Sequence, residues 1–477
     1  MTVFLLITTG FIVHAVPYLW NRSLWIDEAM LASSIFTRGF SDLVSNPLDW
    51  GQSAPIGWLY IVKSLTAVFG SEEYVLRAWS LLSFICMVYL AYLIMKSLLR
   101  VKYPEVFMTI IMLLPFYVRY SNEFKPYMSD NMFVVLSMLL FGLYTAGKIS
   151  LHVIVCAYSA IIWFSFAPVF FISSAMIVIV AGFLYGMFTA KNKSPFSLSI
   201  AECMIVALSF WLNYKLWLSA SSANAGAPEF WAHLKFIFVP SSLEDIKTLY
   251  KMMKELLAPV LSIDKTFAAA IIVLAAAGIV RVFKRRESRT ISVATAGSML
   301  MMCIASRMGF YPISARLVQF VAIVLLIFAS AGFDAFDGDT GSRKIFTLIM
   351  FVFLFVPFMK TLNSIRPSHV YMPGTEAAEN VRYLRANLTS DDVIYVGSLG
   401  IPLFLYESRY TFSPLPLQWR DVRTSSKSGN CILGGATRVN HYAKPYTNNV
   451  EVNIQAIDED IAIIRQHFKL AQTGEPQ

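Results

Sequence analysis

The sequence predicts an all-α polytopic membrane domain over residues 1–360, followed by a small extracytoplasmic α/β domain over 361–477. Composition is the first reason: 57% of the 477 residues are hydrophobic, only 14% are charged, and the mean hydropathy is +0.59. Soluble globular domains carry about 25% charged residues. The second reason is that apolar stretches of about 20 residues, each able to cross roughly 30 Å of hydrocarbon, recur along the first three quarters of the chain. The third is that apolar density falls after residue 360.

About eleven stretches are apolar enough to be transmembrane helices. The first of them lacks a basic leader and a small-x-small cleavage site, so we expect it to be a retained span and not a signal peptide. The predicted spans are 1–20, 75–95, 104–119, 128–147, 151–167, 169–190, 198–219, 265–283, 291–306, 314–332 and 345–360.

The distribution of Lys and Arg orients these spans. The net charge is +9, and thirteen of the 39 Lys and Arg residues fall in alternate short loops, as is typical of the cytoplasmic side of membrane proteins. We therefore expect a cytoplasmic N-terminus and a C-terminal domain on the outer side. By analogy, the compact chain and its separate outer domain favour a bacterial inner membrane over the endoplasmic reticulum. This loop bias accounts for the basic charge without nucleic acid. The cations are Lys96, Arg100, Lys102, Lys148, Lys191, Lys193, Arg281, Lys284, Arg285, Arg286, Arg289, Arg343 and Lys344.

Three segments are expected on the outer side: a first loop over 21–74, a second over 119–127 and a long third over 220–264. Within the first loop, residues 56–69 are apolar but interrupted by Lys63. A stretch of this length is more typical of an interfacial helix than of a span. Counting it as a span would also invert every later loop, so we expect an amphipathic helix on the outer surface.

The C-terminal part shows a different pattern. Residues 375–388 resemble a helix with acidic residues in its early turns, 393–396 a short strand, and 458–470 a second helix. The five cysteines form no disulfide framework and show no metal-ligand spacing. There is also no Gly-rich phosphate loop, so we expect no nucleotide pocket.

The first candidate site residues are Asp27 and Glu28, which follow the first span directly. A partly desolvated carboxylate at the headgroup level can act as a general base, because burial raises its pKa. The alternative is that one of the two caps a juxtamembrane helix that begins here. The two interpretations are compatible for different members of the pair.

The second candidate group, Arg119, Glu123, Lys125 and Tyr127, lies in the second outer loop. Cations on the outer side run against the positive-inside tendency. Arg and Lys can hold a phosphate leaving group, and Glu123 can orient Lys125. The alternative is an interfacial cluster whose charged ends reach the headgroups.

Arg316 is the third candidate. It is expected just inside the start of the tenth span, where an unpaired cation is costly, so a phosphate or a carboxylate is the expected partner. The alternative is again a side chain that extends to the interface.

Four motifs in order resemble membrane glycosyltransferases of the GT-C fold that use polyprenyl-phosphate sugars. This group includes the protein O-mannosyltransferases and the lipid A aminoarabinose transferases. The motifs are Trp25-Ile26-Asp27-Glu28-Ala29; Gln52-Ser53-Ala54-Pro55-Ile56-Gly57-Trp58-Leu59-Tyr60 with Phe69-Gly70-Ser71-Glu72 and Leu76-Arg77-Ala78-Trp79-Ser80; Glu123-Phe124-Lys125-Pro126-Tyr127; and Phe310-Tyr311-Pro312 with Ala315-Arg316-Leu317.

The resemblance implies a specific chemistry. One sugar would move from a polyprenyl phosphate to a lipid A or other glycolipid, a glycan or a protein on the outer side, with inversion. Asp27 is then the expected base, Glu28 its acidic partner, and Lys125 stands where many relatives have Arg. No cofactor is required, although a divalent cation held by Asp27 and Glu123 is compatible with the chemistry. Two rival classes are a transporter or lipid flippase, and a noncatalytic polysaccharide-assembly protein.

Overall fold

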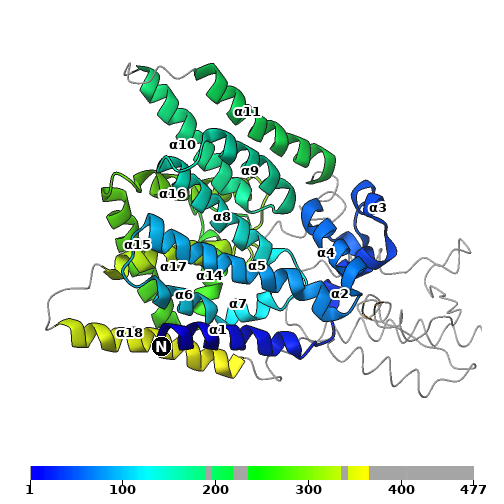
Figure 1. Cartoon of the computed structure of the whole chain (residues 1–477), viewed down its shortest axis with the longest axis horizontal. Coiled ribbons are helices and arrows are strands. Elements are labelled where there is room, and N and C mark those ends of the chain that lie inside the picture. The colour runs from blue at the N-terminus through cyan, green and yellow to red at the C-terminus, as the bar shows by residue number, and fades with distance from the viewer. Residues whose placement is uncertain are drawn as a thin grey trace, which may run out of the picture. The chain divides into compact units, whose positions relative to one another are not determined.

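The structure is a computed structural model that describes residues 2–188, 196–218, 235–334 and 342–364, together with Leu403 and Tyr406. Within these residues the chain is helical and contains no strand (Figure 1). The described residues fall into two units. The first holds 2–22, 38–47 and the described part of 53–364; the second holds 23–37, 48–52, Leu403 and Tyr406.

The helices follow the predicted spans closely. Those of the first unit are α1 (Thr2–Leu19), α3 (Phe40–Ser45), α4 (Ile56–Phe69), α5 (Glu73–Leu93), α6 (Pro104–Met112), α7 (Pro115–Ser121), α8 (Tyr127–Thr145), α9 (Leu151–Phe164), α10 (Pro168–Phe188), α11 (Phe196–Asn213), α14 (Leu243–Leu261), α15 (Lys265–Lys284), α16 (Arg289–Arg307), α17 (Phe320–Phe333) and α18 (Ser342–Ser364). Two π-helical turns, η2 (Ile94–Leu98) and η3 (Tyr214–Leu218), extend α5 and α11.

Five helices in the described part are long and apolar enough to cross a membrane, and the protein is an integral membrane protein. Shorter apolar helices, including α9 and α17, occupy other predicted spans. The number of crossings and the sides on which the loops lie stay predictions. The five long helices are Glu73–Leu98, Tyr127–Thr145, Pro168–Tyr185, Lys265–Lys284 and Arg289–Arg307.

The predicted third span, 104–119, is wrong as a single helix. It is broken into α6 and α7 at Leu113 and Leu114, because Pro115 follows. Proline has no N–H to donate and disfavours the helical conformation in the residue before it. Leu114 accordingly adopts an extended conformation with ψ 116°. The break places a short helix, α7, immediately before the charged turn at residues 122–126.

The predicted loop 220–264 contains a helix that the sequence analysis did not foresee. α14 begins with a capping box in which Ser242 accepts the Asp245 N–H at 3.1 Å while the Asp245 carboxylate accepts the Ser242 N–H at 3.1 Å. Met252, Leu256 and Val260 recur at helical spacing and are buried. Through this face α14 packs against α7, α15 and α17.

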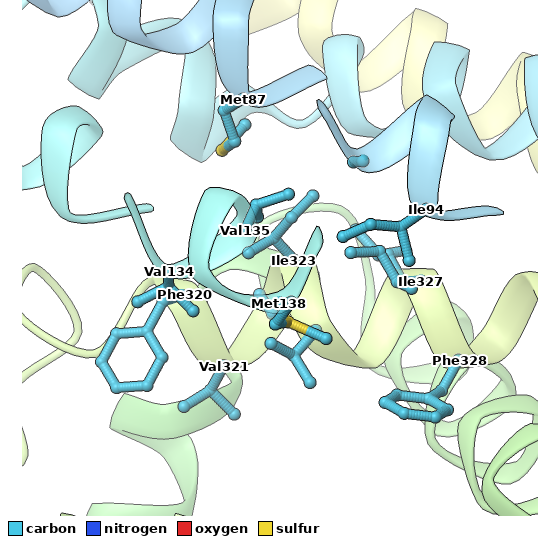
Figure 2. Packing of buried hydrophobic residues seen from close by; sticks show 14 of the residues in the cluster. Met87, Ile94, Val134, Val135, Met138, Phe320, Val321, Ile323, Ile327 and Phe328 are labelled. Atoms are coloured by element: carbon cyan, nitrogen blue, oxygen red, sulfur yellow. The ribbon is translucent and has the colours of Figure 1, made fainter. Parts of the chain in front are cut away.

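The core lies where α5, α8 and α17 meet. Figure 2 shows Met87 and Ile94 facing side chains of α8 and α17, among them Met138 and Ile323. These side chains are at most 8% exposed. Because α8 starts directly after the charged turn and α17 directly after the loop that carries Arg316, this packing fixes both segments from one side.

α15 and α17 approach each other backbone to backbone. A Cβ built on Gly278 would lie 1.8 Å from the Phe328 carbonyl oxygen, and one on Gly332 would lie 1.9 Å from the Leu274 oxygen. Only glycine fits at such a contact, which is typical of helix pairs in membranes, where small residues allow close packing.

The second unit is built on α2 (Ile26–Thr37). A 3-10 turn, η1 (Asp49–Gly51), is attached to it through Ser34, whose Oγ donates to the Asp49 carboxylate at 3.0 Å and accepts the Asp49 N–H at 2.9 Å. Phe36 packs against Tyr406, with ring centroids 5.9 Å apart. The helices and strand predicted for the α/β domain over 361–477 lie outside the described residues, since α18 ends at Ser364.

Candidate active site

The carboxylate pair opens helix α2. Asp27 is partly exposed and Glu28 is fully buried, and both lie in the first turn. The Trp25 N–H donates to the Glu28 carboxylate at 3.1 Å, which satisfies one of the amide groups that a helix start leaves open. The capping alternative is therefore confirmed for Glu28. Asp27 lies in the same turn, and its expected role as base stays a prediction.

The charged turn joins α7 to α8. Its backbone closes tightly at Lys125, whose N–H donates to the Glu123 carbonyl at 2.9 Å, and the Ser80 hydroxyl of α5 donates to the carbonyls of Glu123 and Lys125 at 2.8 and 3.2 Å. Phe124 stacks on Trp58 of α4 at 5.2 Å between ring centroids. Glu123 is 1% exposed and Lys125 6% exposed. Two opposite charges are thus held rigidly in a buried position.

Arg119 and Tyr120 extend this charge cluster. The Arg119 Nε lies 3.8 Å from a Glu123 carboxylate oxygen, and half of the Arg119 side chain is exposed. Tyr120, which follows the predicted third span, has a pKa raised to about 12, mainly by burial. Glu123 raises this pKa further, whereas Arg119 and Arg316 lower it. Tyr120 thus lies within electrostatic range of all three, and its phenol stays neutral at physiological pH.

Arg316 lies in the loop between α16 and α17. The prediction that it sits inside the tenth helix is wrong, because α17 begins only at Phe320. The loop is tied down at Gln319, whose backbone carbonyl accepts the Tyr117 hydroxyl at 3.0 Å and whose side-chain oxygen accepts from Asn131 at 3.0 Å. These bonds attach the Arg316 loop to α7 and α8, on either side of the charged turn.

Tyr127 begins α8 and is 8% exposed. Its ring contacts Tyr120 edge to face, with centroids 5.6 Å apart. On the Arg316 loop, Tyr311 lies within electrostatic range of Tyr127 and of the buried carboxylate of Asp130; burial raises the pKa of Tyr311 well above its usual range, and Asp130 adds to the rise. The Tyr311 hydroxyl donates to the Leu317 carbonyl at 2.7 Å, so it holds the loop closed next to Arg316.

The first unit therefore brings together the predicted substrate-binding residues, which come from two segments about 200 positions apart. Sequence reasoning assigned no role to Tyr120, Tyr311 and Glu255, the last of which accepts the Ala315 N–H at 2.6 Å. Tyr311 stands in the fourth motif beside Arg316, and Tyr120 lies next to Arg119. Asp27 and Glu28 belong to the second unit, and their distance from Lys125 stays a prediction.

The carboxylates among the candidate residues determine whether a divalent cation could bind there. Carboxylate oxygens such as those of Asp27 and Glu123 suit a hard divalent ion, whereas Glu28 is committed to capping α2. In the described residues, no group of three or more His, Cys, Asp or Glu side chains is arranged to hold a metal.

No family model and no curated protein matches this chain. Solved structures do. An Archaeoglobus fulgidus oligosaccharyltransferase, in a complex with Zn and sulfate, matches 81% of this chain with a TM-score of 0.51 and 14% identity. The match spans only 55% of that longer protein.

Two structures of ArnT from Cupriavidus metallidurans match over more of their length. The apo form has a TM-score of 0.52 and 11% identity, covering 85% of this chain and 87% of ArnT. The form bound to undecaprenyl phosphate has a TM-score of 0.56 and 10% identity, covering 86% and 85%. The oligosaccharyltransferase and ArnT are both GT-C fold glycosyltransferases, and the GT-C fold predicted for this chain is confirmed.

Proposed function

We propose that this protein is a membrane glycosyltransferase that moves one sugar from a polyprenyl phosphate to an acceptor on the outer side of the membrane. The observation that carries the proposal is the buried Glu123–Lys125 turn, joined by Arg119 and Arg316, in a chain with this fold. Three cations and one carboxylate form a cluster suited to an anion. Buried charge of this kind is costly and marks functional sites in membrane proteins.

The donor phosphate is the expected ligand of these cations. Arg316 and Arg119 can form charge-assisted hydrogen bonds to phosphate oxygens, and Lys125 contributes a point charge. One of the matching structures, ArnT, was solved with undecaprenyl phosphate, a lipid with the same chemistry. As the bond between sugar and phosphate breaks, the leaving oxygen gains negative charge, and preorganised cations stabilise that charge.

Asp27 is the proposed base. It takes the proton from an acceptor hydroxyl or amine as that atom attacks the anomeric carbon, and the polyprenyl phosphate leaves from the opposite face, which inverts the anomeric centre. Such base catalysis contributes about 10²–10⁴ in rate. Arg22, which precedes Asp27 by five residues, donates to the Asn122 carbonyl of the charged turn at 3.3 Å; the proposal requires Asp27 to come within reach of the anomeric carbon of the donor.

The remaining acidic residues position this constellation. Glu28 fixes the first turn of α2 and with it the backbone of Asp27. Glu123 lies in the turn that carries Lys125 and close to Arg119. A divalent cation held by Asp27 and Glu123 would polarise the donor phosphate. The proposed transfer does not require this cation.

The proposal is tested in proteoliposomes that contain the purified protein, a labelled polyprenyl-phosphate sugar and extracted envelope acceptors. Wild type should transfer label to an acceptor, and Asp27→Asn should lower the rate by at least about 100-fold. Asp42→Asn, which changes an exposed carboxylate in the same predicted outer loop, is the matched control. Movement of intact donor across sealed vesicles without sugar transfer would instead identify a flippase.

A further inference from the structure

A shallow groove, largely open to its surroundings, runs along the C-terminal half of α15, and its six lining residues all lie on this helix or at the C-cap that follows it. It has a volume of about 690 Å³ and is lined by two classes of side chain. The apolar wall of the groove consists of the small residues Ala276, Ala277 and Val280. The lining residues that follow along the helix carry positive charge. The cationic side chains are Arg281, Lys284 and Arg285. Because α15 is one of the helices long and apolar enough to span a membrane, we expect the apolar part to face hydrocarbon and the basic part to lie at its edge.

The arginines of the groove are held in place by neutral acceptors. Arg281 Nη1 donates to the Ala331 carbonyl at the end of α17 at 3.1 Å, and Arg285 Nη1 donates to the Leu99 carbonyl at 2.7 Å. A carbonyl oxygen fixes a guanidinium without cancelling its charge. The one carboxylate near Arg281 is that of Asp334, at 3.9 Å from Nη2. The guanidinium groups thus stay cationic in fixed positions.

Positive charge exceeds negative charge at this end of the bundle. In the described part of the chain, the carboxylates here are Asp334, Glu287 and Glu105; Glu287 pairs with Arg100 at 2.9 Å, and Glu105 accepts from the Tyr92 hydroxyl at 3.2 Å. The cations are Arg100, Lys102, Arg281, Lys284, Arg285, Arg286 and Arg289. The positive-inside tendency explains cations in this loop. It does not explain an apolar groove that leads directly up to them.

We propose that this groove binds an anionic phospholipid, separate from the polyprenyl donor. The lipid phosphate would sit against Lys284 and the two arginines, and the first part of one acyl chain would lie along Ala276, Ala277 and Val280. Basic pockets at the ends of transmembrane helices bind anionic headgroups in this way. A free phosphate would make the polar contacts alone, so the apolar wall distinguishes the lipid from a soluble anion.

The experiment titrates the purified full-length protein in detergent with short-chain phosphatidylglycerol and with phosphatidylcholine of the same chain length. Wild type should bind phosphatidylglycerol more tightly. Lys284→Gln should weaken this binding about fivefold. Ala276→Phe, which fills the groove and leaves the charge unchanged, should weaken it at least as much. Both positions are exposed, so unchanged thermal unfolding is expected for each variant.

Two matched control variants distinguish lipid binding at the groove from nonspecific electrostatic attraction of the lipid to the protein. Lys251→Gln removes an exposed cation on α14, and Ala269→Phe enlarges an exposed alanine on α15 outside the groove; neither should change the affinity. Equal effects of Lys284→Gln and Lys251→Gln, or no effect of Ala276→Phe, would overturn the proposal. So would displacement of the lipid by inorganic phosphate at equal concentration, which would show that the apolar wall contributes nothing.

Discussion

At the residue scale, the site depends on a few charges held in place by neutral groups. Ser80 binds the two carbonyls of the Glu123–Lys125 turn, and Tyr311 closes the loop that carries Arg316. Neutral hydroxyls can position a charge without competing for it. We therefore expect each charged residue to contribute separately to the binding of an anionic substrate.

Removing the Lys125 charge should weaken donor binding. A hydrogen bond to a charged group is worth about 1.5–3 kcal/mol, so Lys125→Gln should raise the Kd for polyprenyl phosphate roughly 10- to 100-fold. Lys125→Arg keeps the charge and should recover most of the affinity. Lys254→Gln, which changes an exposed cation on α14, should bind like wild type. Wild-type affinity in Lys125→Gln would exclude this residue from the phosphate site.

Glu28 should act mainly on the stability of α2. Loss of the carboxylate that accepts the Trp25 N–H costs about 1 kcal/mol. Glu28→Ala should therefore speed hydrogen exchange of the α2 amides about fivefold, and Glu28→Gln, which keeps an acceptor oxygen, should have a smaller effect. The measurement is exchange followed by mass spectrometry of α2 peptides. Unchanged exchange in Glu28→Ala would show that the cap is dispensable.

At the element scale, proline, glycine and capping residues decide where helices end and how closely they pack. Pro115 splits a predicted span into α6 and α7, and the resulting short helix leads directly into the charged turn. The capping box at Ser242 starts α14, which in turn supplies Glu255 to the Arg316 loop. The site is therefore positioned by helix ends together with side chains from within helices, such as Ser80 of α5 and Glu255 of α14.

The contact between α15 and α17 should be intolerant of even one methyl group. Gly278→Ala would place Cβ 1.8 Å from a backbone oxygen, so the two helices must separate, at a cost of about 1–3 kcal/mol or more. Gly182→Ala in α10 meets no atom within 4 Å and should be neutral or stabilising by up to about 1 kcal/mol. Unfolding midpoints in detergent compare the two. Equal midpoints would show that the helices are not packed this closely.

The elements and the site differ in how far the sequence could predict them. Hydropathy located the helices because membrane spans need long apolar runs. It missed α14, whose polar face lowers its average hydropathy, and it missed the break at Leu114, where the apolar run continues. The residues Arg119, Glu123 and Lys125 could be found because they lie within a few positions of one another. Their grouping with Arg316 and Tyr311 depends on tertiary packing, which no local pattern encodes.

At the scale of the whole molecule, the proposed function places the chemistry on one side of the membrane, and the basic surface of α15 is predicted on the other. Lys284 and its neighbours are predicted to be cytoplasmic, whereas the 220–264 segment is predicted to lie outside. This separation suits a donor made on one side and consumed on the other. In the proposed reaction the sugar donor would supply the energy, so we expect no nucleotide requirement on the outer side.

This orientation can be tested with single cysteines in a variant from which the five native cysteines have been removed. Ser241→Cys should react in intact cells with a maleimide that cannot cross the membrane, and Arg286→Cys should react only after permeabilisation. Both side chains are exposed, so accessibility alone does not limit labelling. Labelling in the opposite order would invert the topology and place the charged turn on the cytoplasmic side.

The most direct measurement of the central claim is mass spectrometry of envelope lipids and glycans from cells that lack this gene. Complementation with wild type should restore one defined monosaccharide on one acceptor, and Asp27→Asn, at matched expression, should leave that sugar missing. Full restoration by Asp27→Asn would contradict the assignment of Asp27. An envelope with unchanged sugars in the absence of the gene would contradict glycosyl transfer itself.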